Sequence, residues 1–191
     1  MQVWVTRHGQ TDLNRRHLMQ GRTDAPLNAR GLYQARAARL LLGEQEFDLV
    51  YASPLQRAIQ TAAIIGDTQA VLTDPRLREQ DFGRYELRPY WQVAPHMGAA
   101  WLFPDYFAAP PTVESYAAMV ERTTSFVADL KESGAETVLI ACHGAIMRFV
   151  CGALLETPNH LAGRWLPRSC AIRRFESLNG HFRELGRPGK E

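Results

Sequence analysis

The stretch Val3-Trp4-Val5-Thr6-Arg7-His8-Gly9-Gln10-Thr11 opens the chain and decides its fold. Its apolar residues favour a buried strand, and the abrupt change to Arg, His and Gly marks where the chain turns toward solvent or a ligand. In open α/β sheets, ligands bind at the carboxyl ends of the strands. An ordinary strand exit with solvated Arg7 and His8 also fits this stretch, so the rest of the chain has to distinguish the two interpretations.

Strand-like and helix-like segments alternate through the rest of the chain. Asn28 is a suitable helix N-cap, and Ser53-Pro54 supplies an N-cap followed by proline at the first helical position. The expected segments are, in order, a helix over residues 28–42, a strand over 49–52, helix 54–65, strand 71–73, a helix from 114, strand 137–142, a helix to about 155, strand 170–175 and a short edge strand near 181–182. This order predicts an α/β fold, with a mostly parallel sheet covered by helices on both faces.

Residues 87–112 carry several prolines and many aromatic residues, without a clear period. A disordered linker would not be so aromatic, because that much apolar surface requires either burial or a flat ligand. We therefore expect a single domain over residues 1–191, with a small cap inserted at about residues 84–112.

The composition narrows the function class. The chain has 191 residues, 46% of them hydrophobic, and a formal net charge of +2, which indicates a soluble globular protein without a nucleic-acid-binding surface. No apolar stretch approaches the roughly 18 residues that a membrane span needs, so we expect no membrane partner. The three cysteines, Cys142, Cys151 and Cys170, form no CxxC pair and favour reduced thiols in the cytoplasm.

Three of the predicted strand ends would bring basic side chains to one edge of the sheet. They deliver Arg7 and His8, Arg57, and His143. Two guanidinium groups, two imidazoles and a helix N-terminus suit a dianion such as phosphate. A metal is disfavoured, because two arginines would repel a cation and no set of acidic ligands accompanies them. We expect neither a metal nor another cofactor.

The cluster belongs to a longer series of motifs. The blocks are, in order, Arg7-His8-Gly9-Gln10-Thr11 with Asn14; Gln20-Gly21 with Pro26-Leu27 and Gly31; Ser53-Pro54-Leu55 with Arg57-Ala58 and Thr61-Ala62; Leu77-Arg78-Glu79 with Phe82-Gly83 and Glu86; and His143-Gly144 with Arg148. In these residues the chain resembles the histidine phosphatase superfamily, which has the phosphoglycerate mutase-like fold. The resemblance runs from residue 3 to about residue 150 in the expected order.

The resemblance implies a phosphomonoesterase that works through a phosphohistidine. His8 would attack phosphorus, and Glu79 would protonate the leaving alkoxide and later take a proton from water. Glu79 has to be protonated at the start, which the negative charge of a bound phosphate favours. The expected phosphate-binding set is Arg7, Asn14, Gln20, Gly21, Arg57, His143 and Gly144. Two alternatives concern the acid: Glu79 in a surface ion pair with Arg76 or Arg78, and Glu86 as the acid instead.

A rival nucleophile lies in the same sequence. Cys142 and Arg148 fit the C-x5-R signature of cysteine-dependent phosphatases. That signature needs a loop of backbone N–H groups wrapped around a phosphate, whereas Ile146 and Met147 have the character of a helix interior. We therefore prefer His8 as the nucleophile and interpret Cys142 as a small buried residue.

The insertion is shorter than in the mutases of the superfamily, which favours a phosphatase. Among phosphatases, the chain resembles the alpha-ribazole phosphatases of cobalamin biosynthesis in its length, in Gly83-Arg84-Tyr85-Glu86-Leu87-Arg88 and in Ser169-Cys170-Ala171-Ile172. An aromatic cap suits a flat base, which could stack on Tyr90, Trp91 or Trp101. The expected substrate is therefore alpha-ribazole 5′-phosphate.

Other functions stay open at this point. The chain could be a broad-specificity sugar or small-metabolite phosphatase, a phosphoglycerate mutase-like enzyme, or a non-catalytic protein that binds a phosphorylated ligand or a partner. A homodimer is compatible with the sequence. One departure from the family concerns the cap edge, where Thr112-Val113-Glu114-Ser115 stands in place of the usual Gly-Gly-Glu-Ser turn.

Overall fold

The computed structural model describes residues 1–102, 109–157 and 167–185, apart from the side chains of residues 98–102. Within these ranges no helix is both long and apolar enough to cross a membrane. The predicted cap aromatics Trp101, Phe103, Tyr106 and Phe107 have side chains outside the described residues.

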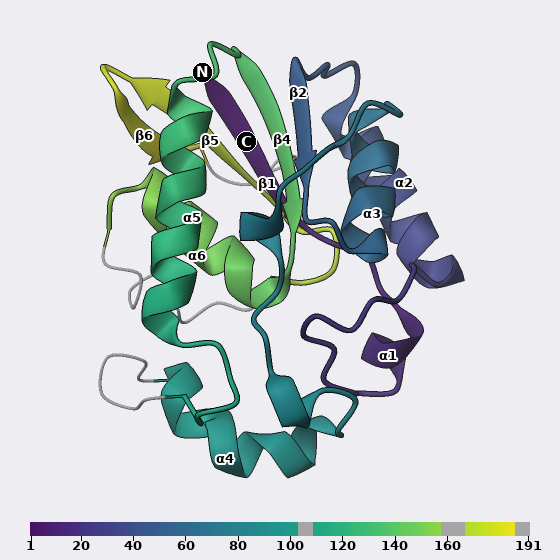
Figure 1. Cartoon of the computed structure of the whole chain (residues 1–191). Coiled ribbons are helices and arrows are strands. Elements are labelled where there is room, and N and C mark those ends of the chain that lie inside the picture. Colours follow the sequence, from purple (N-terminus) through teal and green to yellow (C-terminus); the bar gives the residue numbers. More distant parts are fainter. Residues whose placement is uncertain (103–108, 158–166, 186–191) are drawn as a thin grey trace.

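A six-stranded sheet forms the centre of the protein (Figure 1). Its order is β3 (Leu72–Thr73), β2 (Leu49–Ala52), β4 (Thr137–Cys142), β1 (Gln2–Arg7), β5 (Ile172–Leu178) and β6 (His181–Glu184). The first four strands run parallel, β5 pairs antiparallel with β1, and β6 pairs antiparallel with β5. The predicted α/β fold with a mostly parallel sheet is confirmed.

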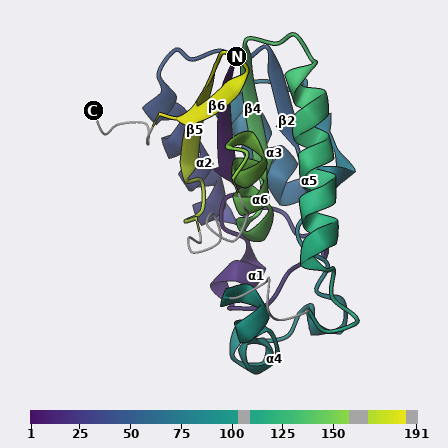
Figure 2. The same cartoon turned by 90° about the vertical axis from the view of Figure 1, so that its left-hand side faces the viewer.

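Helices cover both faces of the sheet (Figure 2). One face packs on α2 (Ala29–Leu42) and α3 (Gln56–Gly66), the other on α5 (Tyr116–Lys131) and α6 (Gly144–Leu154). Successive strand residues point to opposite faces: Val3 and Val5 belong to the core beside α5 and α6, whereas Trp4 belongs to the core beside α2 and α3. Burying an apolar side chain of this size contributes about 1.5–3 kcal/mol, so both faces stabilise the fold.

The start of α3 differs from the prediction. We expected Ser53 as the N-cap of a helix from Pro54, but α3 begins at Gln56, and its N-cap Leu55 makes no side-chain cap. The Oδ1 atom of Asp24 accepts a hydrogen bond from the Gln56 backbone N–H at 2.8 Å instead. A cap supplied by a distant loop cannot be read from the local sequence. The helix over 28–42, by contrast, is capped by Asn28 as predicted.

The cap contains a helix that the sequence did not predict. A short 3-10 turn, η2 (Gly83–Tyr85), leads to α4 (Tyr90–Leu102), which lies beyond the lower edge of the sheet in Figure 1. Pro95 lies inside α4 and obscured its period, since proline normally interrupts a helix. A small apolar cluster joins this helix to the rest of the cap and to the loop after β1. Its members are Met19, Phe82, Tyr85, Val93, Met97 and Val113.

Two further short elements lie close to the sheet edge. They are α1 (Asp12–Arg15), which follows β1, and η1 (Pro75–Leu77), which follows β3. The loop between α1 and α2 pairs with the start of the cap, because Leu87 donates a backbone hydrogen bond to Met19 O at 2.7 Å and Tyr90 donates one to His17 O at 3.0 Å. The cap is therefore attached to the loop that contains Gln20 and Gly21.

Candidate active site

The carboxyl ends of β1 and β4 bring two histidines together. Arg7 and Cys142 are register partners, and the backbone N–H of His8 donates to Cys142 O at 2.9 Å. His143 follows as the N-cap of α6. The imidazole rings of His8 and His143 lie 5.1 Å apart between their centroids. Adjacent parallel strands thus produce the pairing of histidines that the sequence predicted.

His8 is held in one tautomer. Its Nδ1 atom lies 2.7 Å from the carbonyl oxygen of Gly9. A carbonyl only accepts hydrogen bonds, so Nδ1 carries the proton and Nε2 carries the free electron pair. Burial lowers the pKa of His8 well below its ordinary value, and the charges of Arg57 and Arg7 lower it further. The ring is therefore neutral at physiological pH, with Nε2 available as a nucleophile.

His143 is fully buried, and neither of its ring nitrogens has a hydrogen-bond partner among the described residues. Burial lowers its pKa well below the ordinary value, and the charges of Arg57, His8 and Arg7 add to this effect. A buried imidazole without a partner is costly to keep. Its presence indicates a site built for a polar ligand.

Both predicted arginines lie close enough to the histidine pair for their charges to lower the pKa of each ring. The Nη1 atom of Arg7 donates to Pro167 O at 2.6 Å, and a Cβ atom placed on Gly144 would lie 3.5 Å from Arg7 Cζ. Arg57 is fully buried, and its guanidinium donates to Thr23 O at 2.9 Å and to Gly21 O at 2.8 Å. The Nε atoms of both arginines lack a partner in the described part of the chain.

The charges of this cluster are unbalanced. Within the described residues, neither Arg7 nor Arg57 forms an ion pair with a carboxylate. Burial lowers the pKa of Arg57, an effect that the nearby carboxylates of Glu79, Asp24 and Glu86 oppose. Buried cations are normally paired, so an anion that enters this cluster satisfies donors that the protein leaves open. The arrangement suits a phosphate group.

Glu79 lies beside the N-terminus of α6. Its Oε2 atom is 3.4 Å from the backbone nitrogen of Ala145, and its Oε1 atom accepts from its neighbour Gln80 at 3.0 Å. The alternative ion pair of Glu79 with Arg76 or Arg78 is not formed among the described residues, and Arg76 binds Asp74 at 2.7 Å and Asp129 at 2.6 Å instead. The half-buried carboxylate of Glu79 therefore stays close to the cluster.

Glu86, the alternative acid, is fully engaged elsewhere. Its Oε1 atom accepts from the backbone N–H of Arg22 at 2.7 Å. Its Oε2 atom accepts from the backbone N–H of Thr23 at 2.8 Å and from the Thr23 hydroxyl at 2.5 Å. These three hydrogen bonds hold both carboxylate oxygens on the backbone and hydroxyl of residues 22 and 23, so neither oxygen is free to reach a leaving group. The structure thus argues against Glu86 as the acid.

Asn14 and Gln20 form a neighbouring group around Thr11. The Oδ1 atom of Asn14 accepts from the Thr11 backbone N–H at 3.2 Å, and Gln20 Oε1 accepts from the Thr11 hydroxyl at 2.9 Å. Because both oxygens are occupied, their amide N–H groups are the atoms left to contact a ligand. Within the described part of the chain, neither side chain forms a hydrogen bond with His8 or His143.

Three threonines to which the sequence assigned no role support the site, and two of them, Thr11 and Thr61, belong to the quoted motifs. Thr61 accepts a hydrogen bond from the Gly9 N–H at 3.0 Å and donates to Arg57 O at 2.7 Å. Thr11 orients Asn14 and Gln20, and Thr23 holds Arg57 through its carbonyl. Thr61 lay inside a matched motif, but the pattern gave it no role. Thr23 acts through its backbone oxygen, which no residue pattern reveals.

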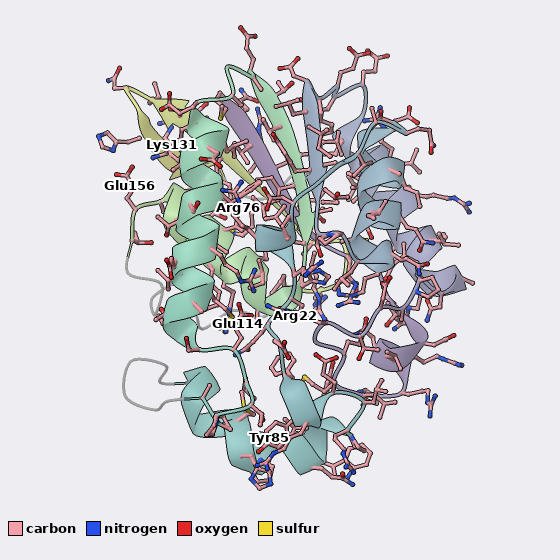
Figure 3. The ribbon with its side chains drawn as sticks, viewed as in Figure 1. Arg22, Arg76, Tyr85, Glu114, Lys131 and Glu156 are labelled. Atoms are coloured by element: carbon pink, nitrogen blue, oxygen red, sulfur yellow. The ribbon has the colours of Figure 1, made fainter. Side chains whose placement is uncertain are left out.

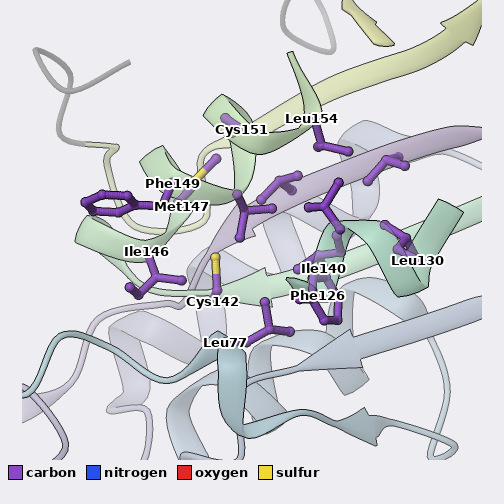
Figure 4. Close-up of a cluster of buried hydrophobic side chains, with 14 of the residues drawn as sticks. Leu77, Phe126, Leu130, Ile140, Cys142, Ile146, Met147, Phe149, Cys151 and Leu154 are labelled. Atoms are coloured by element: carbon purple, nitrogen blue, oxygen red, sulfur yellow. The ribbon is translucent and has the colours of Figure 1, made fainter. Parts of the chain in front are cut away.

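Cys142 does not belong to the site. Its side chain is fully buried in the apolar core between the sheet and helices α5 and α6, beside Leu77 and Ile146 (Figure 4). Burial raises the pKa of its thiol well above the ordinary value. A buried, protonated thiol is a poor nucleophile. Residues 144–148 form the first turns of α6 rather than a phosphate loop, so the structure contradicts the cysteine alternative.

Comparison with known proteins places the chain in a family. The sequence model of the histidine phosphatase superfamily (branch 1) matches residues 3–186. The chain belongs to this superfamily. The predicted enzyme class, a phosphoric monoester hydrolase of the histidine phosphatase type, is thereby confirmed. In the described part of the chain, no group of three His, Cys, Asp or Glu residues could hold a metal ion.

Individual relatives are named after different substrates. A Hydrogenobacter thermophilus protein named as a phosphoserine phosphatase is 34% identical over 154 residues, which cover 78% of this chain and 75% of the relative. The Escherichia coli adenosylcobalamin/alpha-ribazole phosphatase is 33% identical over 164 residues, 83% of this chain and 81% of the relative. A mycobacterial glucosyl-3-phosphoglycerate phosphatase, solved in complex with VO3, is 28% identical and superposes with a TM-score of 0.87 over 99% of both chains.

Proposed function

We propose that this protein is a metal-independent phosphomonoesterase that acts through a phosphohistidine at His8. The observation that carries the proposal is the set of buried, unpartnered donors around a neutral His8, namely Arg7 Nε, Arg57 Nε and the ring of His143. A phosphate ester bound to these donors would bring its phosphorus to the Nε2 side of His8. The donors stabilise the charge on the non-bridging oxygens as the phosphoryl group moves, which is usually the largest contribution to such catalysis.

The reaction proceeds in two steps. In the first step His8 Nε2 forms a bond to phosphorus, the bond from phosphorus to the ester oxygen breaks, and the carboxyl group of Glu79 gives its proton to the leaving alkoxide. In the second step water attacks the phosphohistidine, the Glu79 carboxylate takes up a proton from that water, and inorganic phosphate leaves neutral His8. The contact between Glu79 and the N-terminus of α6 supports this role, since it keeps the carboxyl group beside the two histidines.

The substrate that we propose is alpha-ribazole 5′-phosphate, and the inserted cap at about residues 84–112 would select it. The relatives named as alpha-ribazole phosphatases support this choice. So does the first turn of α4, where Trp91 is 66% exposed and Tyr90 is 36% exposed. Both rings are available to stack on a flat base, and Tyr90 is attached through its backbone to the loop that leads to Gln20. A cytoplasmic location agrees with such a metabolite as substrate.

Phosphate release tests the proposal. The panel contains alpha-ribazole 5′-phosphate, phosphoserine and glucosyl-3-phosphoglycerate, each in excess EDTA, with wild type, His8→Ala and Cys142→Ser. We expect wild type and Cys142→Ser to be active without metal and alpha-ribazole 5′-phosphate to have the highest kcat/KM. Activity of His8→Ala, or of none of the proteins, would refute the phosphatase mechanism. A higher kcat/KM for another ester would refute only the substrate.

A further inference from the structure

The phosphate-binding Arg57 is held by a loop rather than by a carboxylate. Its Nη2 atom donates to Gly21 O at 2.8 Å, and its Nη1 atom donates to Thr23 O at 2.9 Å. Carbonyl oxygens are neutral, so they fix the guanidinium without cancelling its charge. The position of Arg57 therefore depends on how rigidly residues 20–24 are held.

Glu86 holds the same loop from the opposite side. The peptide unit between Gly21 and Arg22 gives its carbonyl oxygen to Arg57 and its N–H to Glu86 Oε1, at 2.8 and 2.7 Å. The positive N–H end of this peptide faces the carboxylate of Glu86, and its negative carbonyl end faces the guanidinium of Arg57. Both interactions are therefore attractive. Thr23 is held in a similar way, since its N–H and hydroxyl bind Glu86 Oε2 while its carbonyl binds Arg57.

The sequence of the loop is fitted to this carboxylate. Gly21 has a φ angle of +54°, and a Cβ atom on it would lie 2.1 Å from Glu86 Oε1. Any side chain at this position would displace either the loop or Glu86. The close approach of Gly21 to Glu86 is independent of the hydrogen bonds, and it indicates that the carboxylate belongs to the architecture of the loop.

Other contacts secure the ends of the loop. Inside it, the Thr23 N–H is shared between Glu86 Oε2 and the Gln20 carbonyl oxygen at 3.0 Å, whereas the Arg22 N–H and the Thr23 hydroxyl bind Glu86. Asp24 caps α3 through the Gln56 N–H at 2.8 Å. The side chain of Arg22 pairs with Asp81 at 3.2 Å and with Glu114 at 3.5 Å, and Figure 3 shows Arg22 and Glu114 together between the sheet and the cap. These ion pairs involve partly exposed side chains, which contribute little to rigidity.

We propose that Glu86 is a positioning residue for phosphate binding, which acts on Arg57 through the backbone of residues 21–23. Glu86 lies in the cap segment, so the seating of the cap against this loop sets the phosphate affinity of the sheet edge. The inference rests on the proposed function only in that Arg57 binds a phosphate. It assigns no proton transfer to Glu86.

A double-mutant cycle tests the proposal. Binding of inorganic phosphate is measured by titration calorimetry for the full chain as wild type, Glu86→Gln, Arg57→Lys and the double variant. Glu86→Gln replaces one carboxylate oxygen by an NH2 group, which cannot accept a hydrogen bond from the backbone N–H group that faces it. The loop is then held less rigidly. We expect Glu86→Gln to weaken phosphate binding about 10-fold in the wild-type background, the loss of roughly one charged hydrogen bond. Arg57→Lys removes the guanidinium group that binds both carbonyl oxygens. In this background we expect Glu86→Gln to weaken phosphate binding by less than about 3-fold.

Glu114→Gln is the matched control. Glu114 forms a bidentate pair with Arg122, at 2.8 and 3.0 Å, and touches the loop only through the side chain of Arg22. The same chemical change just beyond the C-terminal end of the cap should alter phosphate affinity by less than about 2-fold. An equal loss for Glu86→Gln in both Arg57 backgrounds, or no loss in the wild-type background, would overturn the proposal.

Two further measurements keep the test decisive. If Glu86→Gln does not fold, Thr23→Val removes only the hydroxyl that binds Glu86, and its smaller loss of affinity should likewise disappear in the Arg57→Lys background. In steady-state assays, Glu86→Gln should raise KM and leave the pH profile of kcat unchanged. Calorimetry needs no turnover, so a protein that binds phosphate but hydrolyses no ester would refute the proposed function while the cycle still tests Glu86.

Discussion

The strand-edge cluster of Arg7, His8, Arg57 and His143 differs from the cap, residues 84–112, in how its side chains are held. His8, Arg57 and His143 are at most 3% exposed and surrounded by backbone from several elements, whereas Leu87 and Trp91 of the cap are 51% and 66% exposed. Burial preorganises the cluster for a group that every phosphomonoester shares. The exposed cap surface is free to differ between enzymes that share the chemistry but not the substrate. The relatives of this chain are named after different phosphate esters.

The largest expected effect concerns Glu79, which we propose as the proton donor to the leaving group. Glu79→Gln should lower kcat/KM, which reports only the first step, by about 10²–10³ for an alkyl phosphate, because the amide cannot protonate the alkoxide. For p-nitrophenyl phosphate, whose leaving group needs no proton, the loss should be less than about 10-fold. Steady-state rates with both esters check this. Equal losses with the two esters would show that Glu79 is not the proton donor.

The burial of the two histidines predicts how stability depends on pH. The pKa values of His8 and His143 are lowered in the folded protein. Below about pH 6.5 the unfolded chain therefore binds protons that the folded chain does not, and stability falls as the pH falls. Each histidine contributes up to about 1.4 kcal/mol per pH unit.

Urea unfolding in phosphate-free buffers from pH 7.5 to 5 measures this slope. The double variant His8→Ala/His143→Ala should lose most of it. His181→Asn, which changes an exposed ring on β6, should keep it. An unchanged slope in the double variant would contradict the neutral, buried state of the pair.

Cap substitutions should act on one substrate and not on another. Trp91→Ala should raise KM for alpha-ribazole 5′-phosphate about 5-fold, which is the effect expected from the loss of one aromatic contact. KM for phosphoserine should stay unchanged. Tyr33→Ala removes an equally exposed ring from α2 and should affect neither ester. A similar change in KM for both esters would show that Trp91 does not contact the base.

The smallest effect concerns strain in the cap. Leu87 has a φ angle of +62°, a conformation that costs most residues about 1–2 kcal/mol and costs glycine little. Leu87→Gly should therefore raise stability by about 0.5–1 kcal/mol after the added flexibility of the unfolded chain is subtracted. Leu41→Gly, at an exposed position inside α2, should instead lower stability by about 1 kcal/mol. Thermal unfolding of the two variants checks the opposite signs.

The sequence predicted Arg7, His8 and His143 well because each lies at or directly after a strand end, whereas Arg57 lies in the first turn of α3. The apolar run of β1 predicts where Arg7 and His8 emerge, and the run of β4 does the same for His143. Parallel strands then align these ends without further information. The alternation of Val3, Trp4 and Val5 between the two cores is equally local, since it follows from the two-residue period of a strand.

The remaining features depend on contacts between distant segments, which no local pattern contains. Asp24 caps α3 from a loop, and Glu86 binds backbone atoms of Arg22 and Thr23, so neither role has a sequence signature. Helix α4 forms around Pro95 because Val93 and Met97 are buried in the cap cluster, which overrides the preference of proline. The N-cap of α3, the contacts of Glu86 and the formation of α4 are therefore determined by tertiary packing rather than by local sequence.

The proposed mechanism requires a phosphoryl group bound to His8 during turnover, and rapid quenching can trap this intermediate. Wild type, Cys142→Ser and His8→Ala are mixed with a ³²P-labelled monoester, quenched in alkali and digested to locate the label. We predict an acid-labile phosphate on His8 in wild type and in Cys142→Ser, and none in His8→Ala. Label on another residue, or turnover by His8→Ala at the wild-type rate, would contradict it.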